Sequence, residues 1–310
     1  MEEIIVGSRS SDLAITQTKL VIKKLADKFP DYSFKLKEIS TKGDRILDRP
    51  LKEIGGKGLF IKEIEVALFN GEIDFAVHSL KDMPADLPKG LEILAIPKRA
   101  NPLDVLISKD DLSLDELPQG AKIGTGSLRR RSQLLNYRAD LEVIPIRGNI
   151  NTRLKKLAEQ DLAGIILAAA GLERMGWEDK VSQYLEANIS IPAAGQGALA
   201  IETRADDKKI KKLVKAINHQ ATVDRIKAER SFLEYLDGDC KVPIGAYAEV
   251  ENEELRIMGM VGSLDGSRLI KAQIKGNRAK AKELGVDLAK KLTAQGAKEL
   301  LEQVKRGKKQ

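Results

Sequence analysis

"AKIGTGSLRRRSQLLNYR" (121–138) runs from a short apolar segment through a glycine-containing turn into an amphipathic stretch that starts at a serine. This order is typical of a strand that leads into the N-terminus of a helix. The residues that follow add a strand-like "LEVIPIR" (141–147), a helix-like "NTRLKKLAEQ" (151–160) and a buried, strand-like "GIILAA" (164–169). Alternating strands and helices predict an α/β fold with largely parallel sheets and helices on their faces.

The residues before this stretch carry the same alternation. A first helix is expected to start with Ser10 or Ser11 as its N-cap and to extend to about Lys28. Strand-like segments occupy residues 4–8, 33–39, 74–79, 91–96 and 104–108. The same α/β architecture is therefore expected from the first residues onward.

The pattern changes near residue 220. A helix at 221–236 is followed by three strand-like segments, at 246–250, 255–262 and 268–274, and then by a helical C-terminal stretch. Three strands with helices packed on one face predict a small α+β domain at the C-terminal end. A length of 310 residues suits two domains or three small ones.

Composition narrows the class of protein. The chain has one cysteine, so no disulfide can form within it. Its first residues lack the apolar run of a signal peptide, and the longest apolar stretch (164–172) is too short to span a bilayer. We therefore expect a cytoplasmic protein that does not enter the membrane. Two histidines and one cysteine offer no metal-ligand cluster. His78 is interpreted as a core residue whose ring nitrogens have hydrogen-bond partners.

The charge pattern indicates an anionic ligand. The net charge is +7, and lysine is about twice as common as arginine over the whole chain. Between Ile123 and Leu154 there are six arginines and no lysine. The arginine fork binds carboxylates and phosphates through two hydrogen bonds, whereas lysine is a point charge. "GTGSLRRR" (124–131) places a helix N-terminus there as well, but it lacks the spacing of a nucleotide-binding loop.

Polar side chains follow several of the expected strands, at the edge where ligands bind in such sheets. They are Ser8, Arg9, Ser79, Lys81, Asp82, Thr125, Ser127 and Arg147. Asp82 stands before Met83-Pro84, and the proline favours an extended conformation at Met83. A fixed carboxylate there can act as a general acid or base or stabilise a cation. The alternative is a turn aspartate that accepts a hydrogen bond from its own backbone.

These motifs together resemble the porphobilinogen deaminase (hydroxymethylbilane synthase) family. The matching stretches, in order along essentially the whole chain, are "RSSDLA" (9–14), "GGKGLF" (55–60), "HSLKDMP" (78–84), "GTGSLRR" (124–130), "RGNINTRL" (147–154), "AAAGLERMG" (168–176), "PAAGQGALAIE" (192–202) and "GDCKVPIGAYAE" (238–249). Two departures are Gly126, where the family often has serine, and Asp239, where it has glycine. Neither departure removes a charged contact.

The resemblance implies three domains. Two lobes similar to those of periplasmic binding proteins would comprise residues 1–97 with 195–215, and residues 98–194. The third domain, residues 216–310, would anchor the cofactor. In such a fold "GQGALAIE" is a strand of the first domain.

The resemblance also implies the reaction. Four porphobilinogen molecules are joined head to tail with loss of ammonia, and water releases 1-hydroxymethylbilane for haem and other tetrapyrrole biosynthesis. The chain grows on a dipyrromethane cofactor held by a thioether to the matching cysteine, Cys240. A monomer that needs no metal, membrane or nucleic acid is expected.

The family's site residues carry over onto matching positions. Asp82 matches the catalytic aspartate, which would stabilise the cationic azafulvene left when ammonia departs. Positions that match cofactor contacts are Lys81, Asp82, Thr125, Ser127, Arg129 and Arg130, together with Cys240. Positions that match substrate contacts are Arg9, Ser11, Lys57, Ser79, Arg147, Arg153, Arg174 and Gln196.

Two other classes of protein fit part of the sequence. A two-lobed binding protein for an acidic small molecule would explain the arginines, but it would leave Cys240 without a role. A nucleic-acid-binding protein would suit the isoelectric point of 9.2. Few aromatic side chains are available to stack on bases, however, which counts against it.

Overall fold

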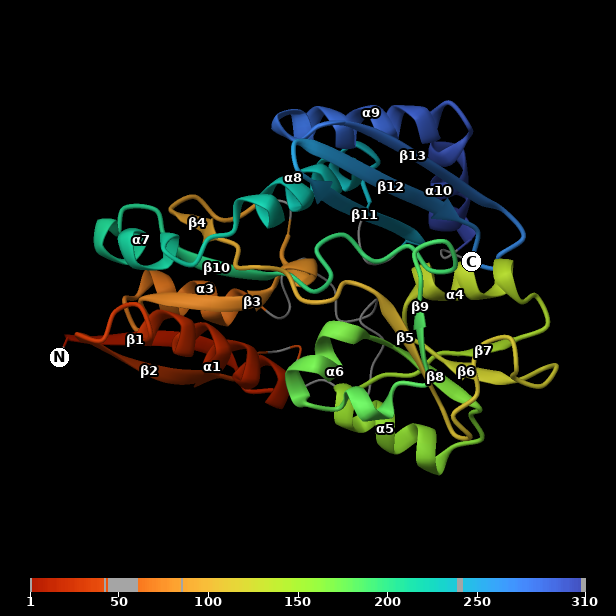
Figure 1. Cartoon of the computed structure of the whole chain (residues 1–310), viewed down its shortest axis with the longest axis horizontal. Helices are drawn as coiled ribbons and strands as arrows, with labels where there is room; N and C mark the ends of the chain where they lie inside the picture. The colour runs from red at the N-terminus through yellow and green to blue at the C-terminus, as the bar shows by residue number, and fades with distance from the viewer. Residues whose placement is uncertain (1, 42, 44–60, 85, 239–241, 308–310) are drawn as a thin grey trace. The chain divides into compact units, whose positions relative to one another are not determined.

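The computed structural model describes residues 2–41, 43, 61–84, 86–238 and 242–307. The chain forms two compact units, Met1–Ala100 with Gly197–Thr222, and Asn101–Gln196 with Val223–Gln310 (Figure 1). Each unit therefore combines two separate stretches of the sequence. The three-domain boundaries expected from the resemblance stay a prediction.

The first unit contains a five-stranded sheet in the order β2-β1-β3-β10-β4. Its elements are β1 (Glu2–Arg9), α1 (Asp12–Ala26), β2 (Tyr32–Ile39), α3 (Lys62–Phe69), β3 (Phe75–Ser79), the 3₁₀ turn η1 (Leu80–Asp82), β4 (Leu91–Ala95), β10 (Leu199–Arg204) and α7 (Lys208–Lys215). β1 pairs in parallel with β2 and β3, whereas β10 is antiparallel to β3 and β4. Four of the five strands thus point the same way. The apolar faces of α1 and α7 pack on this sheet through Val21, Leu25, Ile210 and Leu213.

The second unit contains a sheet of the same size in the order β7-β6-β8-β5-β9. Its elements are β5 (Asp104–Ser108), β6 (Lys122–Gly124), α4 (Leu128–Tyr137), β7 (Glu142–Ile144), α5 (Ile150–Glu159), β8 (Gly164–Ala168), α6 (Ala169–Met175), η2 (Glu178–Lys180) and β9 (Gln183–Leu185). β6 is parallel to β7 and β8, and β5 is antiparallel to β8 and β9. One strand is again reversed among four that point the same way.

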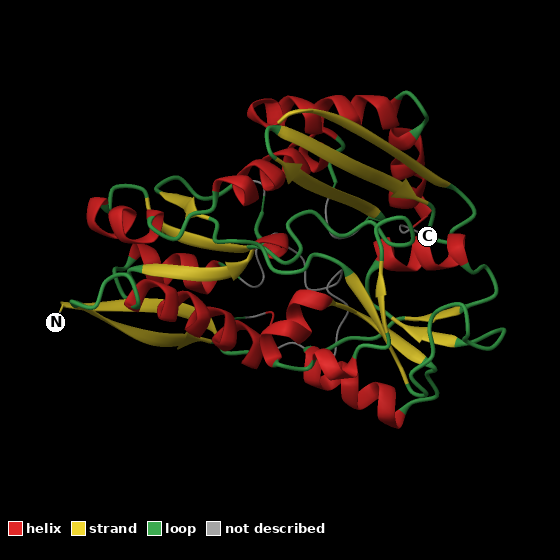
Figure 2. Ribbon diagram, viewed as in Figure 1, coloured by secondary structure: helices red, strands yellow, loops and turns green. Residues whose placement is uncertain are grey.

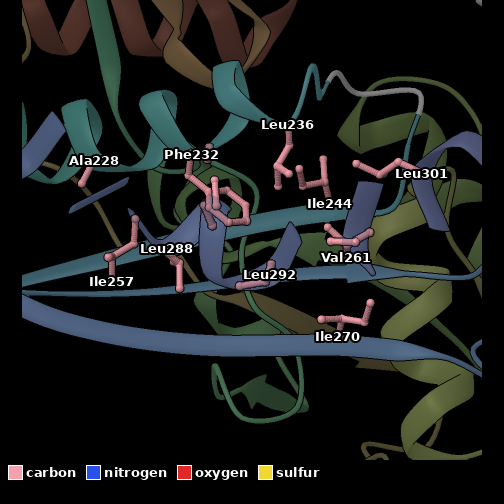
Figure 3. Packing of buried hydrophobic residues seen from close by; sticks show 14 of the residues in the cluster. Ala228, Phe232, Leu236, Ile244, Ile257, Val261, Ile270, Leu288, Leu292 and Leu301 are labelled. Atoms are coloured by element: carbon pink, nitrogen blue, oxygen red, sulfur yellow. The ribbon is translucent and has the colours of Figure 1, made fainter. Parts of the chain in front are cut away.

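A three-stranded antiparallel sheet, β11-β12-β13, completes the second unit, and Figure 2 shows it beside its helices. The elements are α8 (Gln220–Tyr235), β11 (Ile244–Glu251), β12 (Glu254–Gly262), β13 (Leu269–Asn277), η3 (Arg278–Lys280), α9 (Ala281–Thr293) and α10 (Ala297–Gly307). Phe232, Ile257 and Leu288 are fully buried where α8, β12 and α9 meet (Figure 3). A Cβ at Gly259 would lie 2.6 Å from Phe232 Cζ, so this glycine makes room for the ring.

Helix α4 also contacts the turn between β12 and β13. Arg131 Nε donates to the Leu264 carbonyl at 3.0 Å, and Asn136 Nδ2 donates to the Gly266 carbonyl at 3.0 Å. Gly266 has φ = +74°, a conformation that favours glycine. The helix therefore joins the five-stranded sheet of the second unit to its three-stranded sheet.

The predicted fold class is confirmed. In each of the two five-stranded sheets most strands point the same way, and the three-stranded C-terminal sheet forms with helices packed on it. Two details differ from the sequence expectation. One strand in each five-stranded sheet is reversed, and β7 ends at Ile144 because Pro145 has no N–H to donate to a neighbouring strand. Within the described ranges no helix is both long and apolar enough to cross a membrane.

Candidate active site

In the first unit, β1 and β3 are parallel neighbours, so their carboxyl ends lie at the same edge of the sheet. Arg9 is the last residue of β1 and Ser79 the last residue of β3. The turn η1 follows β3 directly and carries Lys81 and Asp82, both with exposed side chains. Met83 is extended before Pro84, as the sequence predicts. The strand ends therefore present two cations, a hydroxyl and a carboxylate together.

A small cavity of about 20 Å³ lies among these residues, large enough for one water molecule. Its polar lining comes from Arg9, Gln17, His78, Ser79 and Asp82. Ser79 Oγ donates a hydrogen bond to Gln17 Oε1 at 3.2 Å. Three predicted site residues, Arg9, Ser79 and Asp82, thus meet at one place. Gln17 was not predicted, because a glutamine inside an amphipathic helix gives no sequence signal of a site.

His78 is buried and its Nε2 lies 2.9 Å from Glu202 Oε2, so the interpretation as a partnered core residue is confirmed. Glu65 stands near this pair. Burial, and then the charge of Glu202, raise the pKa of Glu65, against a smaller effect of His78. His78, which lines the cavity, therefore belongs to a buried pair that links β3 to β10.

In the second unit, the strands β7, β6 and β8 lie side by side and run in parallel. Their carboxyl ends lead to Arg147 after β7, to Thr125 and Ser127 after β6, and to Arg174 on the helix after β8. These four predicted residues therefore follow adjacent strand ends of one sheet. The prediction that they form one shared site with Asp82 involves both units and stays a prediction.

The loop after β6 forms the N-terminus of α4. Ser127 is the N-cap and accepts a hydrogen bond from the Arg130 backbone N–H, while Thr125 Oγ1 accepts one from the Ser127 N–H. A Cβ at Gly126 would lie 2.7 Å from the Ile146 carbonyl oxygen, so a serine at this position would require that backbone to move. The first turn of α4 is thus a helix N-terminus of the kind that attracts anions.

Three further arginines differ in exposure. Arg147 is exposed, and Arg153 donates from Nε to the Gly148 carbonyl at 2.9 Å. Arg174 is half-buried, and burial lowers its pKa to about 10, although Glu173 acts in the opposite direction. A desolvated guanidinium favours an anion as neighbour.

Arg129, Arg130 and Gln196 are buried, and all three donate hydrogen bonds to Asp104. These three residues, which are predicted to contact cofactor or substrate, therefore also form hydrogen bonds within the protein. Asp104 itself was not predicted. The only sign of it in the sequence is its place in the otherwise apolar strand "DVLIS" (104–108). An aspartate is rarely buried in such a strand unless it has a partner.

Three other predicted residues complete the set. Ser11 is the N-cap residue of α1, without a side-chain hydrogen bond to the helix. Lys57 and Cys240 lie outside the described residues. Over the part of the chain that is described, no group of three or more histidine, cysteine, aspartate or glutamate side chains is arranged to hold a metal ion.

Comparison with solved structures gives distant similarities. A probable amino-acid ABC transporter extracellular-binding protein from Bacillus subtilis is 12% identical, with a TM-score of 0.43 over 76% of this chain and 97% of that chain. A periplasmic binding protein of high arginine specificity from Salmonella typhimurium is 13% identical, with a TM-score of 0.41 over 70% of this chain and 92% of that chain.

Comparison with curated proteins gives much closer relatives. Porphobilinogen deaminase of Desulforamulus reducens is 53% identical over 98% of this chain and 99% of the relative. The enzyme of the same name from Brevibacillus brevis is 57% identical over 97% of both chains. Residues 4–212 match the family model described as porphobilinogen deaminase, dipyromethane cofactor binding domain, and residues 223–294 match the model of its C-terminal domain. The chain therefore belongs to the porphobilinogen deaminase family.

Proposed function

We propose that this chain joins four porphobilinogen molecules into 1-hydroxymethylbilane, with Asp82 as the catalytic residue and Cys240 as the covalent anchor of dipyrromethane. The transferase activity and the cofactor follow from the family and its relatives. The residue roles rest on one observation above all. Asp82 lies with Arg9 and Ser79 around a water-sized cavity at the end of two parallel strands.

The described residues suit a dipyrromethane cofactor. Each of its pyrroles carries an acetate and a propionate, so its ligands must be cations and hydrogen-bond donors. The first turn of α4 provides a helix N-terminus with Thr125 and Ser127 at its start, and Arg174 adds a guanidinium whose pKa is lowered by burial. Lys81, Arg129 and Arg130 would add positive charge. When bound, dipyrromethane supplies the pyrrole carbon to which the first substrate is joined.

Asp82 would act on the substrate as ammonia leaves. The departure of ammonia from porphobilinogen produces a cation, and the exposed Asp82 carboxylate can stabilise it through the pyrrole N–H. The proton lost from the attacked pyrrole carbon balances the reaction by ending on the released ammonia. Arg9 and Ser79 line the same cavity and would orient the substrate's carboxylates beside Asp82.

We further propose that the protein works as a cytoplasmic monomer. One chain supplies every residue assigned here to substrate or cofactor, so the reaction needs no second copy. The alternative, a binding protein for an acidic small molecule, would share the arginines but would form no covalent bond with its ligand.

Intact mass measured before and after addition of porphobilinogen tests this function. We expect purified protein to exceed the mass of the bare chain by one dipyrrole, located on the Cys240 peptide, and to gain further single-pyrrole increments with substrate. Active protein with the mass of the bare chain would disprove the anchoring role of Cys240. A ligand that binds without any covalent increment would favour the binding-protein alternative.

Arg147→Lys tests site-specific contacts with the growing chain. Arg147 is exposed in the segment between β7 and α5, and lysine would replace its two-pronged hydrogen bonding with a point charge. We expect one or two chain lengths to accumulate in the mass spectrum of the enzyme during turnover, because only those intermediates would need this contact. Equal slowing of every step would argue against a length-specific contact at Arg147.

A further inference from the structure

Asp104, the first residue of β5, is fully buried and accepts six hydrogen bonds. Its Oδ2 accepts from Arg129 Nη1 and Ser190 Oγ, both at 2.7 Å. Its Oδ1 accepts from Arg130 Nε and Nη2 at 3.0 and 2.8 Å, and from Gln196 Nε2 at 2.8 Å. Arg129 Nη2 adds a longer bond to Oδ1 at 3.2 Å. The carboxylate is therefore saturated, since it offers only about four lone-pair positions.

The two arginines are also held at their other donors. Arg129 Nη1 donates to the Ile191 carbonyl at 2.7 Å, and Arg130 Nη1 donates to the Ile166 carbonyl in β8 at 2.8 Å. Both arginines belong to the first turn of α4. Asp104 thus fixes the two guanidinium planes at the helix N-terminus to which anions are attracted.

This cluster carries an excess of charge. Two guanidiniums, those of Arg129 and Arg130, form ion pairs with the one carboxylate of Asp104. Burial would raise the pKa of Asp104, but Arg129 and Arg130 outweigh it and hold that pKa far below its ordinary value. Asp104 therefore stays ionised, and one positive charge is left in a buried setting. An unmatched buried charge is costly, so the arrangement favours an added anion.

We propose that Asp104 is a positioning residue for the dipyrromethane cofactor. By holding Arg129 and Arg130 in fixed planes, it leaves the first turn of α4 with one unmatched positive charge for a cofactor carboxylate. Asp104 acts through the arginines and touches no ligand. The inference rests on the proposed function, because it takes dipyrromethane as the anion.

Incorporation of the cofactor into apoprotein is the decisive measurement. Apoprotein is produced in a host that cannot make porphobilinogen, then incubated with porphobilinogen, and the dipyrrole mass increment is followed over time. We expect Asp104→Asn to slow incorporation by roughly 10- to 100-fold, because misplaced binding groups lose that much. The amide keeps the size of the side chain but removes its charge and turns one acceptor into a donor.

Asp140→Asn is the matched control. Asp140 pairs with Arg138, just beyond the other end of α4, at 2.6 Å, so the same substitution breaks an arginine–aspartate pair away from the first turn. We expect it to incorporate cofactor at the wild-type rate. Melting temperatures of the apoproteins show how much of each variant is folded, and rates are compared per folded molecule.

The outcomes separate this inference from the proposed function. Folded Asp104→Asn that incorporates dipyrrole as fast as wild type would show that Asp104 only stabilises the fold. If wild-type apoprotein gains no dipyrrole, the proposed function fails first. If Asp104→Asn does not fold, Ser190→Ala is the variant to measure. It removes one hydrogen bond to Asp104 Oδ2 and keeps both ion pairs of Asp104. Incorporation slowed several-fold in that variant supports the proposal, and an unchanged rate overturns it.

Discussion

Asp82→Asn is expected to fold, to retain its dipyrromethane and to lose about 10²- to 10⁴-fold in turnover, the usual contribution of a positioned acid or base. Asparagine has the same size and can still accept a hydrogen bond, but it cannot stabilise a cation by charge. Asp82 is exposed at the end of η1, so the substitution should not disturb the core. The measurement is the rate of porphobilinogen consumption per holoenzyme, with cofactor content determined by intact mass.

Asp86→Asn provides the comparison. Asp86 is exposed, four residues beyond Asp82 in the same connection between β3 and β4. This variant should turn over like wild type, because Asp86 is absent from the cavity lining. Asp82→Asn holoenzyme with near-normal turnover would refute the catalytic role. A variant that lost its cofactor as well would instead assign Asp82 to cofactor binding.

Cys240→Ser is expected to abolish covalent attachment of dipyrromethane and to reduce turnover below detection. Serine keeps the side-chain size, but its hydroxyl is a much weaker nucleophile than a thiolate at neutral pH. The protein after denaturation should have the mass of the bare chain. Substantial turnover by this variant would show that the covalent bond is dispensable.

The single cysteine permits a second test without mutation. The chain has one thiol, so a thiol-selective alkylating reagent will modify Cys240. Alkylation of wild-type apoprotein should therefore reproduce the Cys240→Ser result. Holoenzyme should resist the reagent, because its sulfur is already part of a thioether. Rapid alkylation of active holoenzyme would contradict the anchoring role.

The parts of the site that the sequence predicts well are those at strand ends. Periodicity locates β1, β3 and β6, and parallel strands bring the residues that follow them to one edge. The sequence predicts Arg9, Ser79 and Asp82 in this way, and in the structure they line one cavity. Position after a strand is a local property, so local sequence is enough to find it.

The direction of a strand and the pairing of residues far apart in the sequence cannot be predicted from local periodicity. β5 and β10 are apolar like their neighbours, and nothing in their periodicity indicates that they run antiparallel. Asp104 was missed for a related reason. Its partners Arg129 and Gln196 are 25 and 92 residues away, so only the folded chain reveals the network.

The contacts of α4 with the turn between β12 and β13 affect where the chain can be cut into fragments. The family models separate the chain between residues 212 and 223, whereas the compact unit that contains α4 extends across that boundary to the C-terminal helices. A fragment that stops near residue 222 would leave Arg131 and Asn136 without their carbonyl partners on Leu264 and Gly266. The ends of the family models and the ends of the compact units therefore differ. Chimaeras between family members should therefore exchange residues 101–196 and 223–310 as one cassette, even though the sequence interrupts it.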